Sequence, residues 1–252
     1  MMTQAFDLTR KVAVVTGGTR GIGQDIAIGL AEVGADIVLL QRSDDTSTQE
    51  KIKELGVRCE IIQCDLMNLD EVKQAIPKAI EAMGSVDILV NNAGIQRRSP
   101  AVDFSEQDWD DVLNVNLKAV WILCQQAGRH MVENKSGKII NIASLVSYQG
   151  GLYVPAYASA KGAVGQLTKA LANEWASKGV NVNAIVPGYI ATEMNTALIN
   201  DPIRSRQIIE RIPADRWGNP EDFKGPAVFL ASDASNYVHG HLLAVDGGWL
   251  GR

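Results

Sequence analysis

The sequence predicts an α/β protein with a single domain, built on a doubly wound parallel sheet of seven strands with helices on both faces. Two observations predict this fold. Short apolar runs rich in Val, Ile and Leu alternate with longer amphipathic segments from end to end. The 252 residues contain no internal repeat or linker, so one domain over 1–252 accounts for the whole chain.

Seven apolar runs are the expected strands. Their near-continuous Val/Ile/Leu content is typical of parallel strands that are buried on both faces. In chain order they span residues 12–16, 36–40, 58–63, 87–91, 138–143, 181–186 and 242–245.

Five longer segments between these runs are the expected helices. The first places Ile22, Ile26 and Leu30 on one face. The five segments are 21–33, 68–83, 105–133, 155–178 and 220–231. We expect 188–215 to be irregular and to form a substrate lid, because long loops in compact domains are usually functional.

A glycine-rich turn, TGGTRGIG at 16–23, follows the first strand and opens the first helix. Glycines there let the backbone approach a pyrophosphate at the positive end of a helix, as in Rossmann-type dinucleotide sites. The spacing is GxxxGxG rather than GxGxxG, and a turn without a ligand is the alternative. The residues expected to bind a dinucleotide are Gly17, Thr19, Arg20, Gly21, Ile22 and Gly23.

The end of the second strand indicates which dinucleotide is bound. A carboxylate there would bind the ribose 2′-hydroxyl of NAD, whereas an arginine accommodates the 2′-phosphate of NADP. The chain has Gln41 and Arg42 at this place, with Asp44 and Asp45 shortly after. Arg20 could supply a second guanidinium. We therefore favour NADP(H), with NAD(H) as the alternative.

Tyr157 and Lys161 lie four residues apart, on one face of an expected helix. A nearby ammonium favours the phenolate and lowers a tyrosine pKa from about 10, which suits proton transfer near neutral pH. An exposed surface pair is the alternative for so short a motif.

Together the motifs resemble the short-chain dehydrogenase/reductase family across almost the whole chain. They are the glycine turn, Asn91-Asn92-Ala93-Gly94, Ser144, Tyr157-x-x-x-Lys161 and Pro187-Gly188. The resemblance implies NAD(P)-dependent interconversion of a secondary alcohol and a ketone. It also implies further cofactor contacts by Asp65, Leu66, Asn91, Ala93, Gly94, Tyr157, Lys161, Pro187, Gly188, Ile190 and Thr192.

The resemblance implies a catalytic tetrad of Asn116, Ser144, Tyr157 and Lys161. Tyr157 would transfer the proton, and Lys161 would bind the nicotinamide ribose and lower the tyrosine pKa. Ser144 would hold the substrate oxygen, while Asn116 would complete a proton relay through water. From the residues alone, Asn116 lies on the apolar stripe of its helix, so a buried amide satisfied by the backbone is a second account that can hold at the same time.

Longer stretches resemble the sugar-acid branch of this family, among them NNAGIQRR at 91–98, RIPADRWG at 211–218 and VDGGWLGR at 245–252. The resemblance implies a sugar acid as substrate, such as 2-dehydro-3-deoxy-D-gluconate or a related gluconate. Members of this branch often lack the pair Arg20 and Arg42 and use NAD.

Three further residues are candidates for binding that substrate beside Ser144 and Tyr157. Arg97 and Arg98 could attract its carboxylate, because an arginine fork matches a carboxylate. The alternative is that both are solvated or pair with Asp103 or Glu106. Gln149 would line the pocket.

Two other functions remain open from the sequence. One is an NADPH-dependent carbonyl, ketoacyl, polyketide, steroid or polyol reductase of the same family, although polar residues in 195–211 favour a polar substrate. The other is a non-catalytic dinucleotide sensor, which would not need the tetrad. We expect neither a hydrolase nor a metal site, since no GxSxG elbow surrounds Ser144 and no ligand cluster stands out.

Charge and hydropathy limit the partners. The net charge is −5 and no Lys/Arg-rich run occurs, so nucleic acid is not expected. No apolar run approaches the roughly 18–20 residues that span a bilayer, so we expect no membrane partner and a cytoplasmic location. The three cysteines show no zinc-type spacing and suit a reducing compartment. The resemblance implies a homotetramer, and the apolar ending at 242–250 suits a buried tail.

Overall fold

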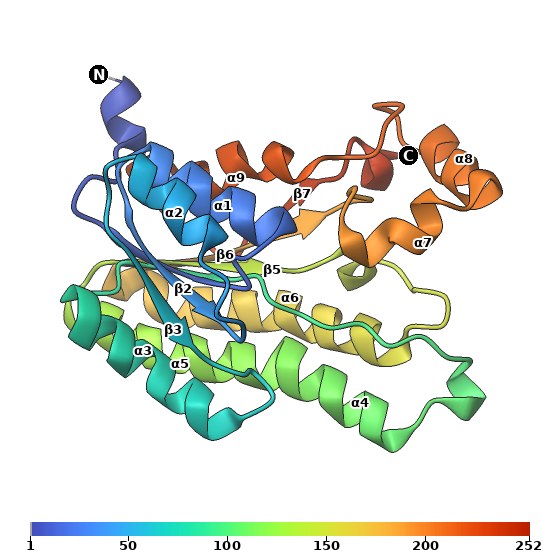
Figure 1. The fold of residues 1–252 in the computed structure, drawn as a ribbon, viewed down its shortest axis with the longest axis horizontal. Helices are drawn as coiled ribbons and strands as arrows, with labels where there is room; N and C mark the ends of the chain where they lie inside the picture. The colour runs from blue at the N-terminus through green and yellow to red at the C-terminus, as the bar shows by residue number, and fades with distance from the viewer. Residues whose placement is uncertain (1) are drawn as a thin grey trace.

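The structure, a computed structural model, describes residues 2–252 and contains one parallel sheet with helices on both faces (Figure 1). The strand order is β3-β2-β1-β4-β5-β6-β7. Every predicted strand is present, with ends that agree to within one residue, so the fold class is confirmed. The strands are β1 (Val12–Thr16), β2 (Asp36–Gln41), β3 (Cys59–Gln63), β4 (Ile88–Asn91), β5 (Gly137–Ile142), β6 (Val180–Pro187) and β7 (Leu242–Val245).

The strand order reverses its direction of growth at β1. The chain builds outward from β1 to β2 and β3, then returns to place β4 on the other side of β1. In open parallel sheets, ligands bind outside the carboxyl ends of the strands at such a switch point. A ligand site is therefore expected at the loops that follow β1 and β4.

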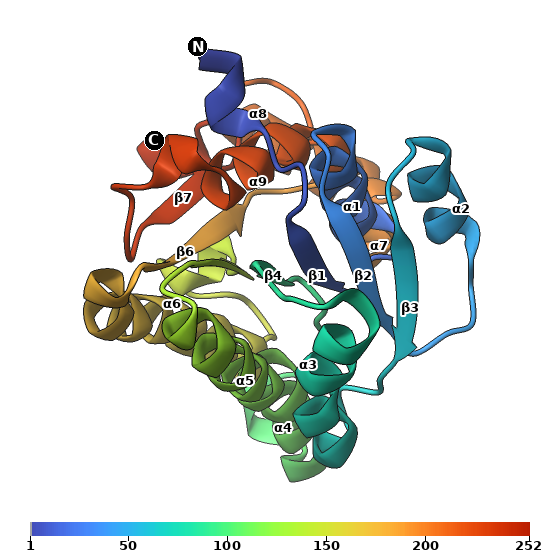
Figure 2. The same ribbon diagram turned by 90° about the vertical axis from the view of Figure 1, so that its left-hand side faces the viewer.

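Helices form a layer on each face of the sheet (Figure 2). α1, α2 and α9 cover one face, whereas α3, α5 and α6 cover the other. α7 and α8 lie beyond the carboxyl ends of the strands. The helices are α1 (Gly21–Glu32), α2 (Ser47–Glu54), α3 (Leu69–Met83), α4 (Glu106–Leu113), α5 (Ala119–Glu133), α6 (Pro155–Trp175), α7 (Thr196–Ile199), α8 (Pro202–Arg211) and α9 (Lys224–Ala231).

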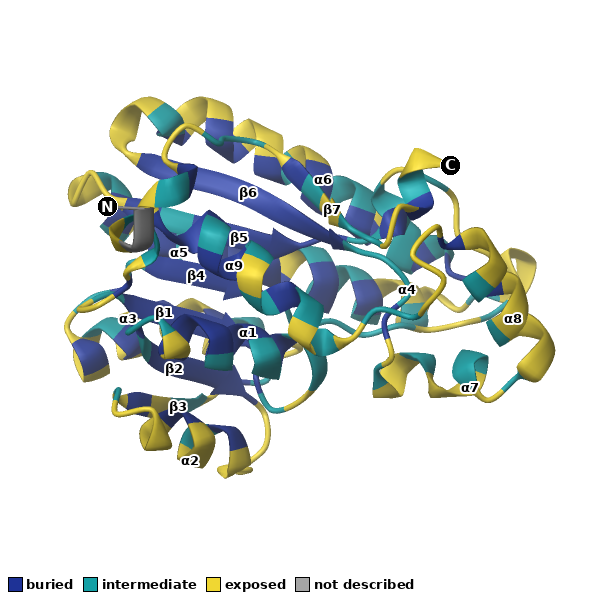
Figure 3. Cartoon of the chain, turned by 90° about the horizontal axis from the view of Figure 1, so that it is seen from above, coloured by how far each residue is buried: buried dark blue, intermediate teal, exposed yellow. Residues whose placement is uncertain are grey.

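The two layers enclose separate apolar cores, and Figure 3 shows the central strands buried between them. β1 contributes to both cores because successive side chains of a strand point to opposite faces. Val12 and Val14 pack on the side of α3, α5 and α6. Ala13 and Val15 pack on the side of α1 and α9. A strand buried on both faces explains the unbroken apolar run that predicted it.

The segment predicted as one helix over 105–133 is two helices joined by a π-helical turn. α4 ends at Leu113, the turn spans Asn114–Lys118, and α5 begins at Ala119. The backbone N–H of Ala119 donates to the carbonyl of Asn114, five residues earlier. Such turns insert one residue into a helix and occur frequently at functional sites.

The prediction of an irregular stretch over 188–215 is wrong, because this stretch contains α7 and α8. Asp201 caps α8 by accepting from the backbone N–H groups of Ile203 and Arg204, both at 3.0 Å. Pro202 follows at the first helical position, where proline is favoured. These start signals were present in the sequence. α2, which was not predicted, is short and polar and buries mainly Thr48 and Ile52.

No helix among residues 2–252 is long and apolar enough to cross a membrane.

Candidate active site

Three of the four predicted tetrad residues, Ser144, Tyr157 and Lys161, lie at the carboxyl end of β5. Ser144 lies two residues past the end of that strand, and Tyr157 lies in the first turn of α6. The Lys161 side chain is only 3% exposed, and its Nζ donates to the carbonyl oxygen of Ile142 at 2.6 Å. This bond ties α6 to the last residue of β5 and fixes the distance between Ser144 and the helix.

The electrostatics of Tyr157 differ from the prediction. Burial raises the pKa of Tyr157, and the influences that oppose the increase are a hydrogen bond with Ser144 and the charge of Arg98. Lys161 Nζ lies 5.8 Å from the centroid of the tyrosine ring and is bonded to the Ile142 carbonyl instead. The expectation that Lys161 lowers this pKa is therefore wrong for the structure as it stands, since sequence spacing predicts a shared helix face but not the partner of the ammonium.

Lys161 itself has a strongly shifted pKa, which gives a testable dependence of stability on pH. Burial lowers the pKa of Lys161 to about 8, whereas an unfolded lysine keeps its proton up to about 10.4. Between these pH values the unfolded chain binds more protons than the folded chain, so the free energy of unfolding rises with pH. Below about pH 8 Lys161 is charged in both states, and the full cost of burying that charge lowers the stability of the folded protein.

We expect the free energy of unfolding to increase by roughly 3 kcal/mol more in the wild type than in Lys161→Met between about pH 7.5 and about pH 10.5. Urea titrations at several pH values measure this difference. Lys138, whose pKa burial also lowers to about 8, is present in both proteins and cancels. Parallel curves for the two proteins would contradict the assignment.

Ser144 is held by a neighbour that the sequence analysis did not identify. Ser144 caps the short helical turn Leu145–Ser147, and its Oγ accepts from the N–H of Val146 at 3.4 Å. Ser147 Oγ accepts from the N–H of Ser144 at 3.3 Å and donates to the carbonyl of Lys161 at 2.7 Å. Ser147 thus connects the backbones of two predicted catalytic residues. A capping pattern of two serines three residues apart was the available signal.

Asn116 is fully buried in the π-helical turn. Its Oδ1 accepts from the N–H of Ile95 at 2.8 Å, and its Nδ2 donates to the carbonyl of Ile95 at 2.8 Å. The prediction of a buried amide satisfied by backbone is confirmed. Asn116 thereby clamps the chain directly after Asn91–Gly94, and its part in a proton relay stays a prediction.

The glycine turn lies close to the loop after β4, as a dinucleotide cradle requires. Asn92 Nδ2 donates to the carbonyls of Thr16 and Gly17 at 3.0 and 3.1 Å. Gly17 and Gly21 have φ values of +65° and +56°, which favour glycine. A methyl group at Gly23 would overlap both the Gly17 carbonyl and the Asn92 amide. The turn therefore has its compact shape only with glycine at these places.

This cradle fits the phosphates of a dinucleotide. Arg20 is the N-cap of α1 and makes no capping bond with its side chain, so the first backbone N–H groups of the helix are available to an anion. The carbonyl of Thr19 accepts from Gln24 Nε2 at 3.1 Å and from Thr48 Oγ1 at 3.3 Å, which anchors the turn to α1 and α2. Ile22 follows as the second residue of α1.

No carboxylate lies at the end of β2, as the sequence predicts. Gln41 is buried, and its Nε2 donates to the carbonyls of Ser43 and Asp45 at 3.0 and 2.7 Å. The amide therefore shapes the loop that presents Arg42, whose side chain is exposed. Arg20 forms an ion pair with Glu193, a residue that the sequence analysis did not identify.

The other predicted cofactor residues lie in the loops after β3, β4 and β6. Asp65 and Leu66 follow β3, and Asp65 donates its backbone N–H to Glu71 Oε2 at 2.8 Å. The N–H of Ala93 donates to Thr16 Oγ1 at 2.9 Å, and Gly94 lies against Asn116. After β6, which ends at Pro187, the chain continues through Gly188, Ile190 and Thr192.

Asn91 is the exception among these residues, because its side chain points into the sheet. Asn91 Nδ2 donates to Asn141 Oδ1 at 2.9 Å and to Cys124 Sγ at 3.3 Å. Asn141 Nδ2 in turn donates to Thr168 Oγ1 on α6 at 3.0 Å. This buried network joins β4, β5, α5 and α6, so the side chain of Asn91 is taken up within the core.

The structure separates the two candidate arginines. Arg97 pairs with Asp108 at 3.1 Å and with Asp111 at 3.9 Å, so the predicted alternative partners Asp103 and Glu106 are wrong. Arg98 is exposed and close enough to Tyr157 to lower its pKa. Of the two, Arg98 is the cation that acts on the candidate catalytic site.

Gln149 is bonded to the C-terminal segment. Its Oε1 accepts from Trp249 Nε1 at 3.3 Å, and Trp249 is 5% exposed. The Trp249 ring packs 4.7 Å from the ring of Tyr189 and 3.9 Å from the Arg211 guanidinium of α8. Gln149, residues of 188–215 and the apolar ending of the chain therefore form one cluster, in which Trp249 was not predicted as a site residue.

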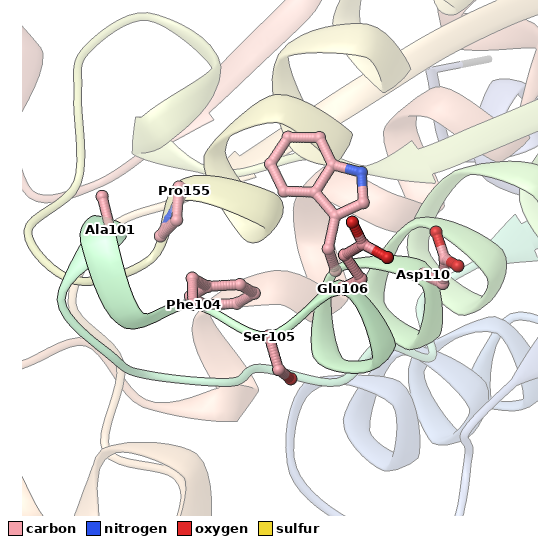
Figure 4. A pocket seen from close by; sticks show the side chains of 7 residues that line it. Ala101, Phe104, Ser105, Glu106, Asp110 and Pro155 are labelled. Carbon is pink, nitrogen blue, oxygen red and sulfur yellow. The ribbon is translucent and has the colours of Figure 1, made fainter.

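A hollow of about 480 Å³ lies beside α4 and the start of α6, and Figure 4 shows its lining. None of the tetrad residues lines it. Phe104 and Pro155 border it, and the carboxylates of Glu106 and Asp110 give it negative charge. Like charges repel, so this hollow does not suit an anionic substrate.

Comparison with known proteins adds family evidence to this geometry. A family profile described as enoyl-(acyl carrier protein) reductase matches residues 17–250. The chain belongs to the short-chain dehydrogenase/reductase family. Among relatives in this family, the 2-dehydro-3-deoxy-D-gluconate 5-dehydrogenases of Pseudoalteromonas atlantica and Escherichia coli are 52% and 50% identical, each over 100% of both chains.

Solved structures of family members have the same fold. The gluconate 5-dehydrogenase of Burkholderia cenocepacia, in complex with NADP and tartrate, is 40% identical with a TM-score of 0.95 over 100% of both chains. An Agrobacterium tumefaciens protein with bound NADP is 48% identical with a TM-score of 0.93, over 98% of this chain and 99% of that one. The predicted family resemblance is thus confirmed.

Proposed function

We propose that this short-chain dehydrogenase/reductase interconverts a secondary alcohol and a ketone on a sugar acid, 2-dehydro-3-deoxy-D-gluconate or a related gluconate, with NADP(H). The observation that carries the proposal is the placement of Ser144, Tyr157 and Lys161 at the end of β5, with Arg98 acting on the tyrosine. Relatives that cover 96–100% of this chain include enzymes named for 2-dehydro-3-deoxy-D-gluconate and gluconate.

The chain's own residues would manage the proton. When bound, the nicotinamide ring supplies or accepts the hydride. In the reducing direction Tyr157 donates its phenolic proton to the carbonyl oxygen, while Ser144 donates a hydrogen bond to the same oxygen. Lys161 binds the nicotinamide ribose through its ammonium, and Asn116 links the site to water. The raised pKa of Tyr157 keeps its proton in place before reaction.

The backbone of the glycine turn and the start of α1 would hold the pyrophosphate, as the uncapped helix N-terminus supports. Arg20 and Arg42 would bind the 2′-phosphate, because the end of β2 carries no carboxylate for the ribose 2′-hydroxyl of NAD. Two structural relatives that contain NADP support this choice over NAD. The loops at Asp65–Leu66, Ala93–Gly94 and 187–192 would complete the cofactor contacts.

Arg98 would bind the substrate carboxylate, with Gln149 beside it and the lid at 188–215 excluding water. We expect Arg98→Ala to lower kcat/KM for the keto-acid about 10- to 100-fold, because a hydrogen bond to a charged group contributes about 1.5–3 kcal/mol. Arg97→Ala is the matched control and should retain kcat/KM, since Arg97 is paired with Asp108. Steady-state kinetics of both variants measure this. An equal loss on an uncharged ketone would refute the role of Arg98 in carboxylate binding.

The proposed function as a whole is tested by a turnover panel of keto-sugar acids, simple ketones and ketoacyl thioesters, each with NADPH and NADH. We expect the highest kcat/KM for a keto-sugar acid with NADPH. Preference for a ketoacyl thioester would instead favour the ketoacyl reductase that the sequence left open.

The same proposal includes a homotetramer in the cytoplasm. Trp109 on α4 and Trp121 on α5 are 37% and 38% exposed, which suits burial between subunits. The cysteines Cys59, Cys64 and Cys124 are free and buried, as in a reducing compartment. Light scattering measures the oligomer.

A further inference from the structure

The base of the lid lies against the glycine turn through two neighbouring residues. Thr192 Cγ2 would be 3.5 Å from a methyl group placed on Gly21. The next residue, Glu193, forms an ion pair with Arg20 through Oε2 and Nη1. The first turn of the lid is itself anchored, because Asn195 Nδ2 donates to the carbonyl of buried Ile190 at 2.9 Å. The carboxylate of Glu193 is therefore held beside the cofactor cradle.

The two arginines assigned to the 2′-phosphate differ in whether they already form an ion pair. Arg20 is already paired with Glu193. Arg42 has no ion pair within residues 2–252. A 2′-phosphate carries close to two negative charges and needs the Arg20 fork, so it competes with Glu193 or is repelled by it. The ribose 2′-hydroxyl of NAD is neutral, so it neither competes with Glu193 for Arg20 nor is repelled by it.

We infer that Glu193 is a specificity-determining residue: it competes with the 2′-phosphate of NADP for Arg20, and NADP binding releases the base of the lid from the glycine turn whereas NAD binding leaves it attached. This inference rests on the proposed function, in which Arg20 binds that phosphate. Glu193, a residue of the lid, would thus weaken the binding of NADP but not the binding of NAD.

The size of the effect follows from the exposure of the pair. The side chains of Arg20 and Glu193 are 75% and 68% exposed. Exposed ion pairs contribute little, so removal of the competitor should tighten binding of a 2′-phosphate by about twofold to fivefold. Calorimetric titration of the full chain resolves such a change.

The test measures Kd for NADP⁺, NAD⁺ and adenosine 2′,5′-bisphosphate in wild type, Glu193→Gln and Glu210→Gln. Glu210 is the matched control because it lies in the lid, pairs with Arg206 at 3.5 Å and loses the same charge on substitution. We expect Glu193→Gln to tighten NADP⁺ and the bisphosphate but not NAD⁺, and Glu210→Gln to change none of them. Equal effects of the two variants, or an equal effect on NAD⁺, would overturn the inference.

The Arg20→Gln variant separates this inference from the proposed function. If Arg20→Gln weakens NADP⁺ while Glu193→Gln has no effect, the competition is refuted and the cofactor assignment stands. If Arg20→Gln leaves NADP⁺ unchanged, the role of Arg20 in the proposed function fails as well. In the Arg20→Gln background, Glu193→Gln should no longer tighten NADP⁺, and persistence of the effect would also overturn the inference.

A second readout needs no cofactor. Amide hydrogen exchange in 193–199 should be faster in Glu193→Gln and in Arg20→Gln than in wild type, by the same factor, because either substitution removes the ion pair. Glu210→Gln should leave this segment unchanged. Unaltered exchange in the first two variants would show that the pair does not hold the lid.

Discussion

Replacing Tyr157 with phenylalanine is expected to reduce turnover about 10²- to 10⁴-fold, the range that a positioned general acid or base contributes. The ring remains to fill its place beside Ser144, so the loss isolates the phenolic proton. Dinucleotide affinity should persist, because most of the proposed cofactor contacts come from the glycine turn and the loops after β3, β4 and β6. Steady-state kinetics and titration with NADPH measure the two quantities separately.

Tyr153→Phe is the matched control for this prediction. Tyr153 lies in the loop before α6, and its side chain is 51% exposed. Loss of its hydroxyl removes none of the tetrad contacts, so turnover should remain near that of the wild type. Substantial turnover in Tyr157→Phe, or an equal loss in Tyr153→Phe, would refute the assignment of Tyr157.

The second large effect is expected from Gly23→Ala. The added methyl group would overlap the Gly17 carbonyl and the Asn92 amide, and neither can move away freely. Asn92 Nδ2 is already bonded to the carbonyls of Thr16 and Gly17. Overpacking of this kind costs about 1–3 kcal/mol of stability. We also expect dinucleotide affinity to fall at least about tenfold, since in the proposed function the same backbone holds the pyrophosphate.

Gly225→Ala provides the comparison, because no atom lies within 4 Å of a methyl group added at this helical position in α9. That substitution should be neutral or stabilising by up to about 1 kcal/mol. Thermal unfolding and calorimetric titration of both variants measure the contrast. Unchanged stability and affinity in Gly23→Ala would show that the turn is less tightly packed than the structure indicates.

The sheet could be predicted closely because its central strands, such as β1 and β4, are buried on both faces and read as continuous apolar runs. The lid could not, because α7 and α8 expose most of their residues and lack such a pattern. Asp201 and Pro202 are start signals for α8, but the sequence analysis did not consider them, and the segment has no long apolar stripe that would mark it as a helix. The break at 114–118 was also missed, since an inserted residue leaves no mark in composition.

The candidate site was predictable in its members but not in its electrostatics. Spacing placed Tyr157 and Lys161 on one helix face, yet burial raises the pKa of Tyr157, and the Lys161 ammonium is bonded to the Ile142 carbonyl. That carbonyl belongs to β5, and only the folded chain brings it to α6. The partners of Arg97, Arg20 and Gln149 are likewise distant in sequence or in another element, so no local pattern could identify them.

The π-helical turn between α4 and α5 makes the length of this segment as important as its composition. An α-helix turns about 100° per residue, so deletion of a single codon within 114–118 would rotate α4 by that angle relative to α5 while every apolar residue of both helices is retained. The clamp of Asn116 on Ile95 would then be misdirected, although no substitution had occurred. We therefore expect this protein to tolerate single-residue insertions and deletions less well at this turn than in the segments on either side of it.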